Sequence, residues 1–103
     1  MSLDTGAMSE TAYYILLALV EERHGYGVIQ HVQELTGNRI VLGAGTIYGT
    51  LTKMEKNKMI QPTRVEEKRK YYQITPYGLE ILRQEINRLG ELYQNGKGVL
   101  SDE

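Results

Sequence analysis

Apolar residues recur at intervals of three and four in the first third of the chain, which predicts two amphipathic helices. The first helix begins after Ser9, whose hydroxyl is suited to capping a helix N-terminus, and Gly25 separates it from the second. The second is expected to stop at Thr36-Gly37-Asn38 with a left-handed C-cap. The expected buried positions are Ala12, Ile15, Leu16, Leu19 and Val20 in the first helix and Tyr26, Ile29, Val32 and Leu35 in the second. The short apolar run at 39–42 then predicts a brief strand.

A third helix is predicted after the glycine pair at 43 and 45, with Ile47, Leu51 and Met54 facing inward. Asn57 is expected to end it in a left-handed turn. The opposite face is polar, and its hydroxyls, single aromatic ring and cations supply donors for phosphate oxygens. The residues on this face are Thr46, Tyr48, Gly49, Thr50, Lys53 and Lys56.

A basic hairpin follows the third helix. Residues 63–65 and 70–74 are expected to pair across a turn at 66–69. Consecutive cations at a hairpin tip have no use in core packing but suit a phosphate backbone, while Tyr72 and Ile74 on one strand face can anchor the hairpin to a core. The hairpin therefore predicts the wing of a winged helix, with DNA-binding residues Arg64, Lys68, Arg69, Lys70 and Tyr71.

The chain ends in a fourth predicted helix. Thr75 is its expected N-cap and Pro76 its first position, where the missing N–H costs nothing. Apolar residues then repeat at steps typical of a helix that packs along another helix. They are Leu79, Leu82, Ile86, Leu89 and Tyr93. Because 103 residues leave little of the chain to cover this helix, we expect a homodimer; the alternative is that it folds back onto the first helix as core.

Together these elements predict an α+β fold, mostly α. It is a winged helix-turn-helix of three helices plus a β-hairpin wing, followed by a C-terminal dimerisation helix. The expected organisation is a flexible N-terminal tail at 1–8, a winged-helix DNA-binding domain at 9–75, the dimerisation helix at 76–95 and a flexible tail at 96–103.

The net charge of −1 argues at first against a nucleic-acid binder, but the charge is unevenly distributed. Residues 39–72 hold eight Lys or Arg against three Glu, whereas residues 1–38 hold one against five acids and residues 73–103 hold three against five. Electrostatic attraction acts locally, over a Debye length of about 8 Å in physiological salt. A basic surface on an acidic body can therefore bind a polyanion.

Other residue types favour no enzymatic, metal or cofactor chemistry. The chain has no cysteine, and His24 and His31 are separated by glycines without an acidic group to complete a metal set. No serine, histidine and carboxylate are arranged for nucleophilic catalysis. The apolar run at 12–20 is too short to span a bilayer, so we expect a cytoplasmic protein without a membrane segment.

All aromatic residues other than histidine are tyrosines, eight in number. Tyr13, Tyr14 and Tyr93 lie on the two helices expected to meet at the dimer seam. Tyrosine offers a flat apolar face with a polar rim, so these rings suit either interface packing or a pocket for a planar ligand.

Several motifs together resemble the PadR-family transcriptional regulators, over most of the chain. Residues 15–19 followed by His24-Gly25-Tyr26-Gly27 look like the family's opening helix and its glycine-tyrosine-glycine junction. Residues 45–48 with Leu51 and Met54-Glu55 are similar to its recognition helix, and residues 69–75 with Gly78 to its wing and the helix start after it. Two departures are Lys58, where many members have glycine, and Gly49, where proline is frequent.

The resemblance implies the compact branch of the family, in which a single C-terminal helix forms the dimer. It implies a repressor that binds double-stranded DNA at a palindromic operator and releases it when a small aromatic or cationic effector binds. Two alternatives stay open. The same basic face could meet an acidic protein, as in a winged-helix interaction module, or the chain could bind a small molecule without recognising DNA.

Overall fold

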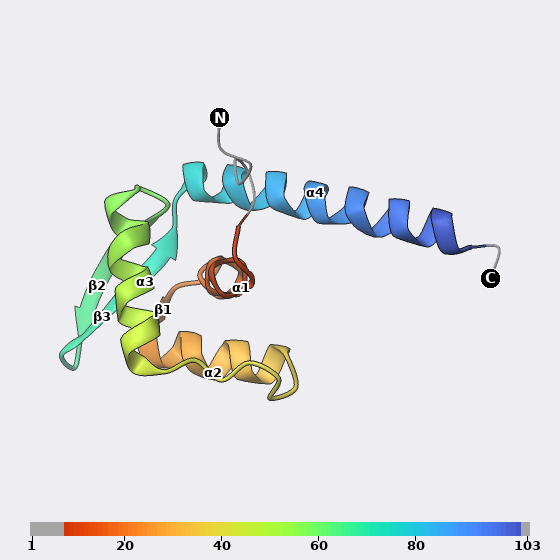
Figure 1. Ribbon diagram of the computed structural model, residues 1–103. Helices are drawn as coiled ribbons and strands as arrows, with labels where there is room; N and C mark the ends of the chain where they lie inside the picture. The colour runs from red at the N-terminus through yellow and green to blue at the C-terminus, as the bar shows by residue number, and fades with distance from the viewer. Residues whose placement is uncertain (1–7, 102–103) are drawn as a thin grey trace.

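A computed structural model describes residues 8–101 of the chain. Its elements are α1 (Glu10–Ala18), β1 (Arg23–His24), α2 (Gly25–Leu35), α3 (Ala44–Lys56), β2 (Ile60–Glu66), β3 (Arg69–Ile74) and α4 (Pro76–Leu100). The first three helices form one body, the sheet lies along α3, and α4 crosses this body and projects beyond it (Figure 1). This mostly helical winged-helix arrangement confirms the predicted fold class.

The predicted helix starts are confirmed by their caps. The Ser9 hydroxyl accepts a hydrogen bond from the N–H of Ala12 at 3.1 Å, and α1 begins at the next residue. At the start of α4 the Thr75 hydroxyl accepts from the N–H of Gly78 at 2.9 Å, and Pro76 is the first helical residue. After α2, left-handed φ angles of 58° at Gly37 and 68° at Asn38 confirm the predicted stop.

The predicted buried face of α2 is wrong at both ends. Tyr26 and Leu35 are each 53% exposed, while Val28 and Val32 are fully buried. In a helix of 3.6 residues per turn, side chains three residues apart are rotated by about 60° relative to one another around the helix axis. Of four residues at this spacing, only the central ones can therefore face the core. The first helix shows a related error, because α1 ends at Ala18 and leaves Val20 42% exposed.

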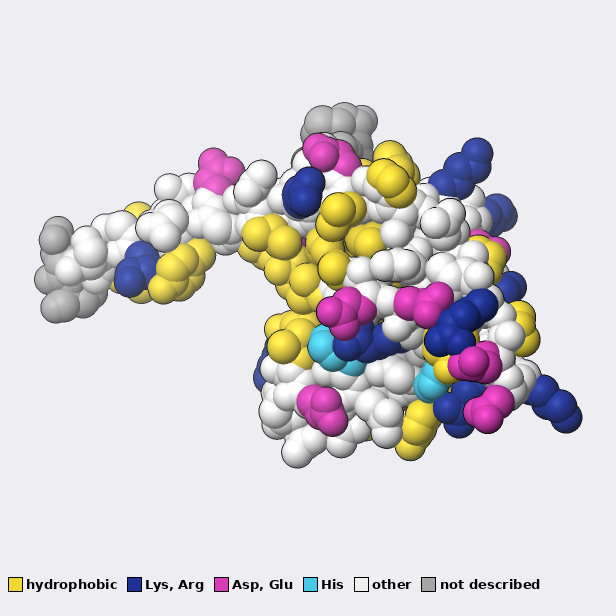
Figure 2. All heavy atoms as spheres, turned by 180° about the vertical axis from the view of Figure 1, so that it is seen from behind, with side chains coloured by type: hydrophobic (Ala, Val, Ile, Leu, Met, Phe, Trp, Pro, Cys, Tyr) yellow, Lys and Arg dark blue, Asp and Glu magenta, His cyan; other side chains and the backbone are white. Residues whose placement is uncertain are grey.

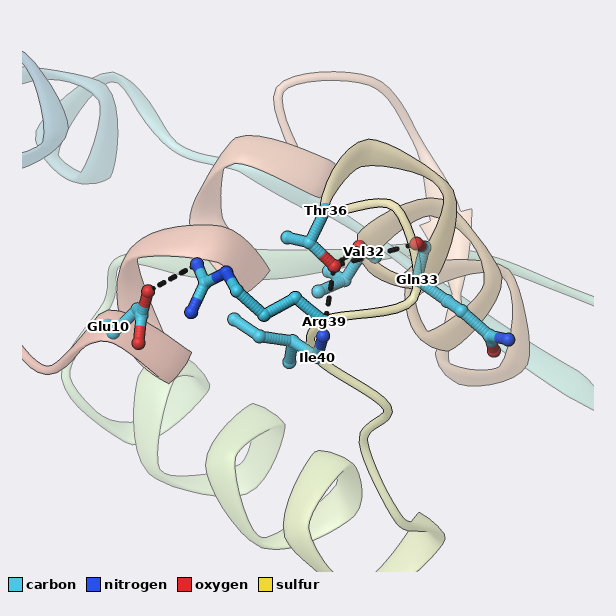
Figure 3. A network of polar contacts seen from close by, with 6 residues as sticks. All are labelled: Glu10, Val32, Gln33, Thr36, Arg39 and Ile40. Carbon is cyan, nitrogen blue, oxygen red and sulfur yellow. Dashed lines mark hydrogen bonds and ion pairs between the residues drawn. The ribbon is translucent and has the colours of Figure 1, made fainter.

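The strand predicted at 39–42 does not form, and that segment is an irregular connection. The third strand is instead β1, which pairs antiparallel with β3 in a sheet of order β1-β3-β2. The connection is held by side chains, because Thr36 Oγ1 accepts from the N–H of Ile40 at 3.1 Å and donates to the carbonyl of Val32 at 2.8 Å (Figure 3). Arg39 bonds Glu10 of α1 at 2.6 Å, and Leu42 is buried in the core. Apolar residues of this segment therefore pack against the core, but the segment does not pair with the sheet.

The basic hairpin is confirmed and its turn is tight. Glu66 of β2 is paired with Arg69 of β3, which leaves a two-residue turn. Both turn residues have positive φ, 52° at Glu67 and 64° at Lys68, as a type I′ turn requires. Tyr72 is 9% exposed and belongs to the core cluster, and Ile74 packs against that cluster, so β3 is anchored as predicted.

The exit from α3 differs from the prediction. Asn57 has an ordinary φ of −86°, and the left-handed residue is Lys58, with φ of 65°. The N–H of Met59 then bonds the carbonyl of Met54 at 2.9 Å, which closes the helix end. The left-handed residue thus falls where glycine is frequent in the resembled family. In this chain the position is Lys58, for which a left-handed backbone conformation is unfavourable.

The terminal helix is longer than predicted. It continues to Leu100, so residues 96–100 are helical and do not form the predicted tail. At the other end, Met8 packs against the core cluster, so the predicted tail at 1–8 excludes this residue; residues 1–7 lie outside the described part of the chain. Across residues 8–101, no helix combines the length and apolar character needed to cross a membrane.

Candidate nucleic-acid interface

The predicted polar face of α3 is exposed except at Thr50, which is half-buried, and it points in two directions. Ile47, Leu51 and Met54 are buried, which turns Thr46, Tyr48 and Gly49 outward. Tyr48 is 54% exposed and borders the wing. Thr50 and Lys53 instead line a separate hollow formed with Met8, which precedes α1, Ala12 of α1 and Ile81 of α4. The predicted DNA-binding set is therefore divided between two sides of α3.

A cleft of about 290 Å³ lies between the start of α2, α3 and the wing. Gly25 at the base of this cleft allows the Tyr48 ring to lie close, since a Cβ at position 25 would be 2.8 Å from Tyr48 Cε1. The residues that line the cleft are His24, Gly25, Tyr26, Tyr48, Lys68, Arg69, Lys70 and Tyr72. The structure thus brings four predicted DNA-binding residues together with the His-Gly-Tyr junction.

Arg64 and Tyr71, also predicted to bind DNA, lie on the outer face of the sheet. The Arg64 guanidinium stacks 3.9 Å above the centre of the Tyr71 ring. It also pairs with Glu22 at 2.9 Å and with Glu66, and these hydrogen bonds, that of Glu22 first, raise the pKa of Arg64. Figure 2 shows positive and negative side chains interspersed around a histidine on this side. Two carboxylates already offset the charge of Arg64, so it is a weaker candidate for binding phosphate.

The remaining cations of α3 and the wing differ in whether a carboxylate already pairs with them. Lys70 Nζ lies 3.9 Å from a carboxylate oxygen of Glu55, a loose ion pair across to α3. Lys53, Lys56, Lys68 and Arg69 form no ion pair within residues 8–101. Lys68 and Arg69 are therefore the cleft cations with no carboxylate to displace when a polyanion binds.

His24, which was not among the predicted DNA-binding residues, links the start of α2 to the wing. Its Nδ1 caps α2 by accepting from the N–H of Gly27 at 3.0 Å, and its Nε2 lies 3.1 Å from Arg69 Nη1. Partial burial, followed by the charges of Arg69 and Arg64, lowers the pKa of His24. Its position immediately before a glycine-rich helix start was the available signal, because polar side chains there serve as N-caps.

The predicted dimer residues fall into two groups. Leu82 is 2% exposed within the chain itself and joins the core, so it is not available to a second copy. This part of α4 packs over α1, which was the alternative to the dimer seam. Leu79 and Leu89 are half-buried, whereas Ile86 and Tyr93 are 43% and 61% exposed. Leu92, Val99 and Leu100 are also exposed, so the distal half of α4 carries an uncovered apolar surface.

The predicted tyrosine pocket is brought together only in part. Tyr13 and Tyr14 meet nearly perpendicularly, with ring centres 5.6 Å apart, and line a hollow of about 300 Å³ beside Leu89. Tyr93 lies farther along α4, where it borders a different surface with Lys97. Within one chain, Tyr93 is therefore not part of this hollow.

An ion pair between buried Glu85 and partly exposed Arg88 forms one wall of the Tyr13–Tyr14 hollow. Glu85 is 2% exposed, and Arg88 donates to its two carboxylate oxygens at 2.9 and 2.6 Å. The N–H of Met8 contributes a longer bond of 3.4 Å. The hydrogen bond from Arg88, followed by that from Met8, lowers the pKa of Glu85 against the opposing effect of burial. The two-point geometry fixes Glu85 and Arg88 in place at the junction of α1 and α4.

Comparison with known proteins agrees with the geometry of the fold and the wing. The sequence pattern of the transcriptional regulator PadR-like family matches residues 15–84. A PadR-like transcriptional regulator from Bacillus cereus is 30% identical, with 90% of this chain and 93% of that one covered and a TM-score of 0.75. A transcriptional regulator from Clostridium thermocellum is 27% identical over 97% of this chain and 95% of that one, with a TM-score of 0.70.

A relative of greater length was also found. A 37.1 kDa protein of transposon TN4556 in Streptomyces fradiae is 29% identical over 79 residues. The aligned part is 76% of this chain but 22% of that protein, so the chain spans about a fifth of that relative's length.

Proposed function

Because the chain belongs to the PadR-like family of transcriptional regulators, it is a DNA-binding regulator, and we propose that it acts as a dimeric repressor of a palindromic operator. The observation that carries this proposal is the cleft between α3 and the wing. There Lys68 and Arg69, which form no ion pair among residues 8–101, stand beside the exposed ring of Tyr48. Such a surface can bind phosphate oxygens through its cations and contact base edges through the tyrosine side chain at the same time.

In the proposed complex α3 enters the major groove and the wing follows the adjacent backbone. Thr46, Tyr48 and Gly49 face the groove, since all three are exposed and Tyr48 borders the wing cleft. Lys68, Arg69 and Lys70 contact phosphates, and Lys53 and Thr50 reach the strand on the opposite side of α3. Arg64 and Tyr71 stabilise the wing by their mutual stacking and supply little of the affinity.

The second copy of the chain is proposed to bind along α4. This helix has 25 residues, a length of about 37 Å at 1.5 Å per residue, and its distal half projects from the body (Figure 1). The seam runs through Ile86, Leu89 and Tyr93 and continues at the same helical spacing to Leu100. Figure 2 shows apolar side chains gathered in the angle between α4 and the body, which a second chain would cover.

An effector is proposed to bind in the hollow beside Tyr13 and Tyr14. Two perpendicular rings favour a planar aromatic compound, and the face of an aromatic ring also attracts a cationic one. The hollow lies where α4 crosses α1, so a ligand there would alter the angle between the dimer helix and the DNA-binding body. A change in that angle changes the distance between the two recognition helices and would release the operator.

Operator selection from random DNA tests the proposal most directly. A dimer that reads two half-sites should enrich a palindrome whose halves lie about one helical turn, roughly 34–36 Å, apart or a multiple of it. Fluorescence polarisation in graded salt then tests the wing. Since each neutralised phosphate contributes about 0.9 to the salt slope, Arg69→Ala should lower the slope by about 1.8 in a dimer.

Arg64→Ala is the matched control for the wing, because the structure pairs Arg64 with two glutamates. It should leave the salt slope near that of the wild type. Enrichment of no sequence together with binding to an acidic protein would favour an interaction module. Stabilisation by planar compounds without DNA binding would favour a small-molecule binder.

A further inference from the structure

The hydrogen bonds of His24 fix which of its ring nitrogens carries the proton. A neutral imidazole has one N–H donor and one acceptor nitrogen. Nδ1 accepts from the N–H of Gly27 at 3.0 Å, so the proton lies on Nε2. Nε2 faces Arg69 Nη1 at 3.1 Å, and a guanidinium has donors only. Two N–H donors, that of Nε2 and that of Arg69 Nη1, therefore face each other, and neither can accept a hydrogen bond from the other.

The His24 ring is held in position by its neighbours, and Arg69 lies beside one of them. His24 lies nearly parallel to Tyr26, with an interplanar angle of 14°, and edge-on to Tyr71 at 5.0 Å between ring centres. The guanidinium of Arg69 lies 5.9 Å from the centre of the Tyr26 ring. His24 is also opposite Tyr71 in the register between β1 and β3, so its ring is set by the sheet as well as by the α2 cap.

The surroundings of the two donors favour an anion. They border the cleft at the wing, where Lys68 adds a further cation with no ion pair among the described residues. The positive end of the α2 dipole opens at the same place. Glu66, on the same wing, is engaged by Arg64 and does not fill the acceptor position.

We propose that His24 and Arg69 form a two-donor clamp for one non-bridging phosphate oxygen of the DNA backbone. The clamp rests on the DNA-binding function proposed above and adds to it a site between the wing and the start of α2. An anionic oxygen that lies beside the pair, within hydrogen-bond distance of both Nε2 and the guanidinium, accepts from both N–H groups and offsets the repulsion between them. A neutral imidazole suffices, because Nδ1 must keep its lone pair to cap α2.

The clamp predicts a specific difference between its two members. His24→Asn retains a side-chain oxygen that can cap α2 but loses the Nε2–H donor. It should weaken binding to the selected operator and to random duplex by about tenfold or more, since a bond to a charged group is involved. Because the lost donor is neutral, the salt slope should stay unchanged, whereas Arg69→Ala should lower it by about 1.8.

A double-mutant cycle tests whether the two residues share one phosphate oxygen. His24→Asn in the Arg69→Ala background should cost clearly less than in the wild type, because the clamp is already broken. His31→Asn, at the other histidine of the chain, is the matched control and should leave affinity unchanged. Thermal unfolding of each variant checks that the fold is retained.

Nitrogen-15 spectra of the wild-type histidines give a test that does not depend on a variant. They should show the Nε2–H tautomer at His24 in the free protein and a shift of its signal on addition of duplex DNA. An Nδ1–H tautomer, additive losses in the cycle, or a shift with inorganic phosphate but none with duplex would each overturn the clamp. If wild-type protein bound no DNA, the proposed function would fail with it; if it bound and His24→Asn bound equally well, only the clamp would fail.

Discussion

Replacing Gly78 by alanine should destabilise the junction between helix α4 and the winged-helix body. Gly78 is buried in the first turn of α4, where the chain leaves β3. A Cβ at this position would lie 2.1 Å from the carbonyl oxygen of Met59 and 2.9 Å from Ile74 Cγ1. The same carbonyl accepts hydrogen bonds from the N–H of Thr75 at 2.9 Å and from its hydroxyl at 3.1 Å. Any retreat of this carbonyl therefore strains the cap of α4.

The magnitude follows from two opposing effects. Overpacking a well-filled site costs about 1–3 kcal/mol, and the upper end applies here because the obstacle is backbone and cannot rotate away. Alanine gains at most about 1 kcal/mol over glycine from helix propensity. The net loss of unfolding free energy is about 2 kcal/mol, which lowers the Tm by roughly 8–16 °C in a domain of this size.

Thermal and urea unfolding at a fixed protomer concentration measure this loss, since an oligomer's Tm depends on concentration. Gly49→Ala is the matched control, because nothing lies within 4 Å of a Cβ at that helical position. It should raise stability by about 1 kcal/mol. Equal stability of Gly78→Ala and the wild type would refute the close approach of Met59 to α4.

Three further outcomes follow from single side chains. Lys58→Gly should raise the unfolding free energy by about 1 kcal/mol, since φ is 65° there, and a urea midpoint at or below that of the wild type would contradict this. Ile86→Asp should give a folded monomer by sedimentation, whereas Leu82→Asp should unfold the chain because Leu82 is 2% exposed; a dimer of Ile86→Asp would count against the seam. Glu85 has a lowered folded-state pKa, so its stabilisation is present above its ordinary value of 4.5 and is lost as pH falls through the folded value. Urea unfolding at descending pH should therefore show a smaller acid loss for Glu85→Gln than for the wild type, and equal losses would exclude this role.

Local chemistry made the helix starts and the wing predictable. Ser9 and Thr75 accept hydrogen bonds from N–H groups three residues later in the chain. Their capping role can therefore be predicted from a few neighbouring residues. The hairpin likewise follows from strand-forming residues on either side of a short polar turn. The wing cations Lys68 and Arg69 could be identified for the same reason, because a tight turn leaves its tip exposed.

Other parts of the site depended on residues far apart in sequence. Arg64 looked equivalent to Arg69 until the fold placed Glu22, 42 positions away, against its guanidinium. The role of His24 required Arg69, 45 positions away, to approach its free nitrogen. No spacing rule reports which charges a fold will pair, so sequence patterns identified the cations but not which of them remain free.

By itself, then, the sequence determined where α1 and α4 begin, where the hairpin turns and which segment carries positive charge, since these depend on neighbours within a few residues. The tertiary structure decided which strand completes the sheet, which face of α2 is buried and that Leu82 belongs to the core. It also placed the left-handed turn on Lys58. The physical reason is that burial and strand pairing depend on contacts between segments that are far apart in the sequence. Several segments could cover the same surface, and only the folded structure shows which of them packs there best.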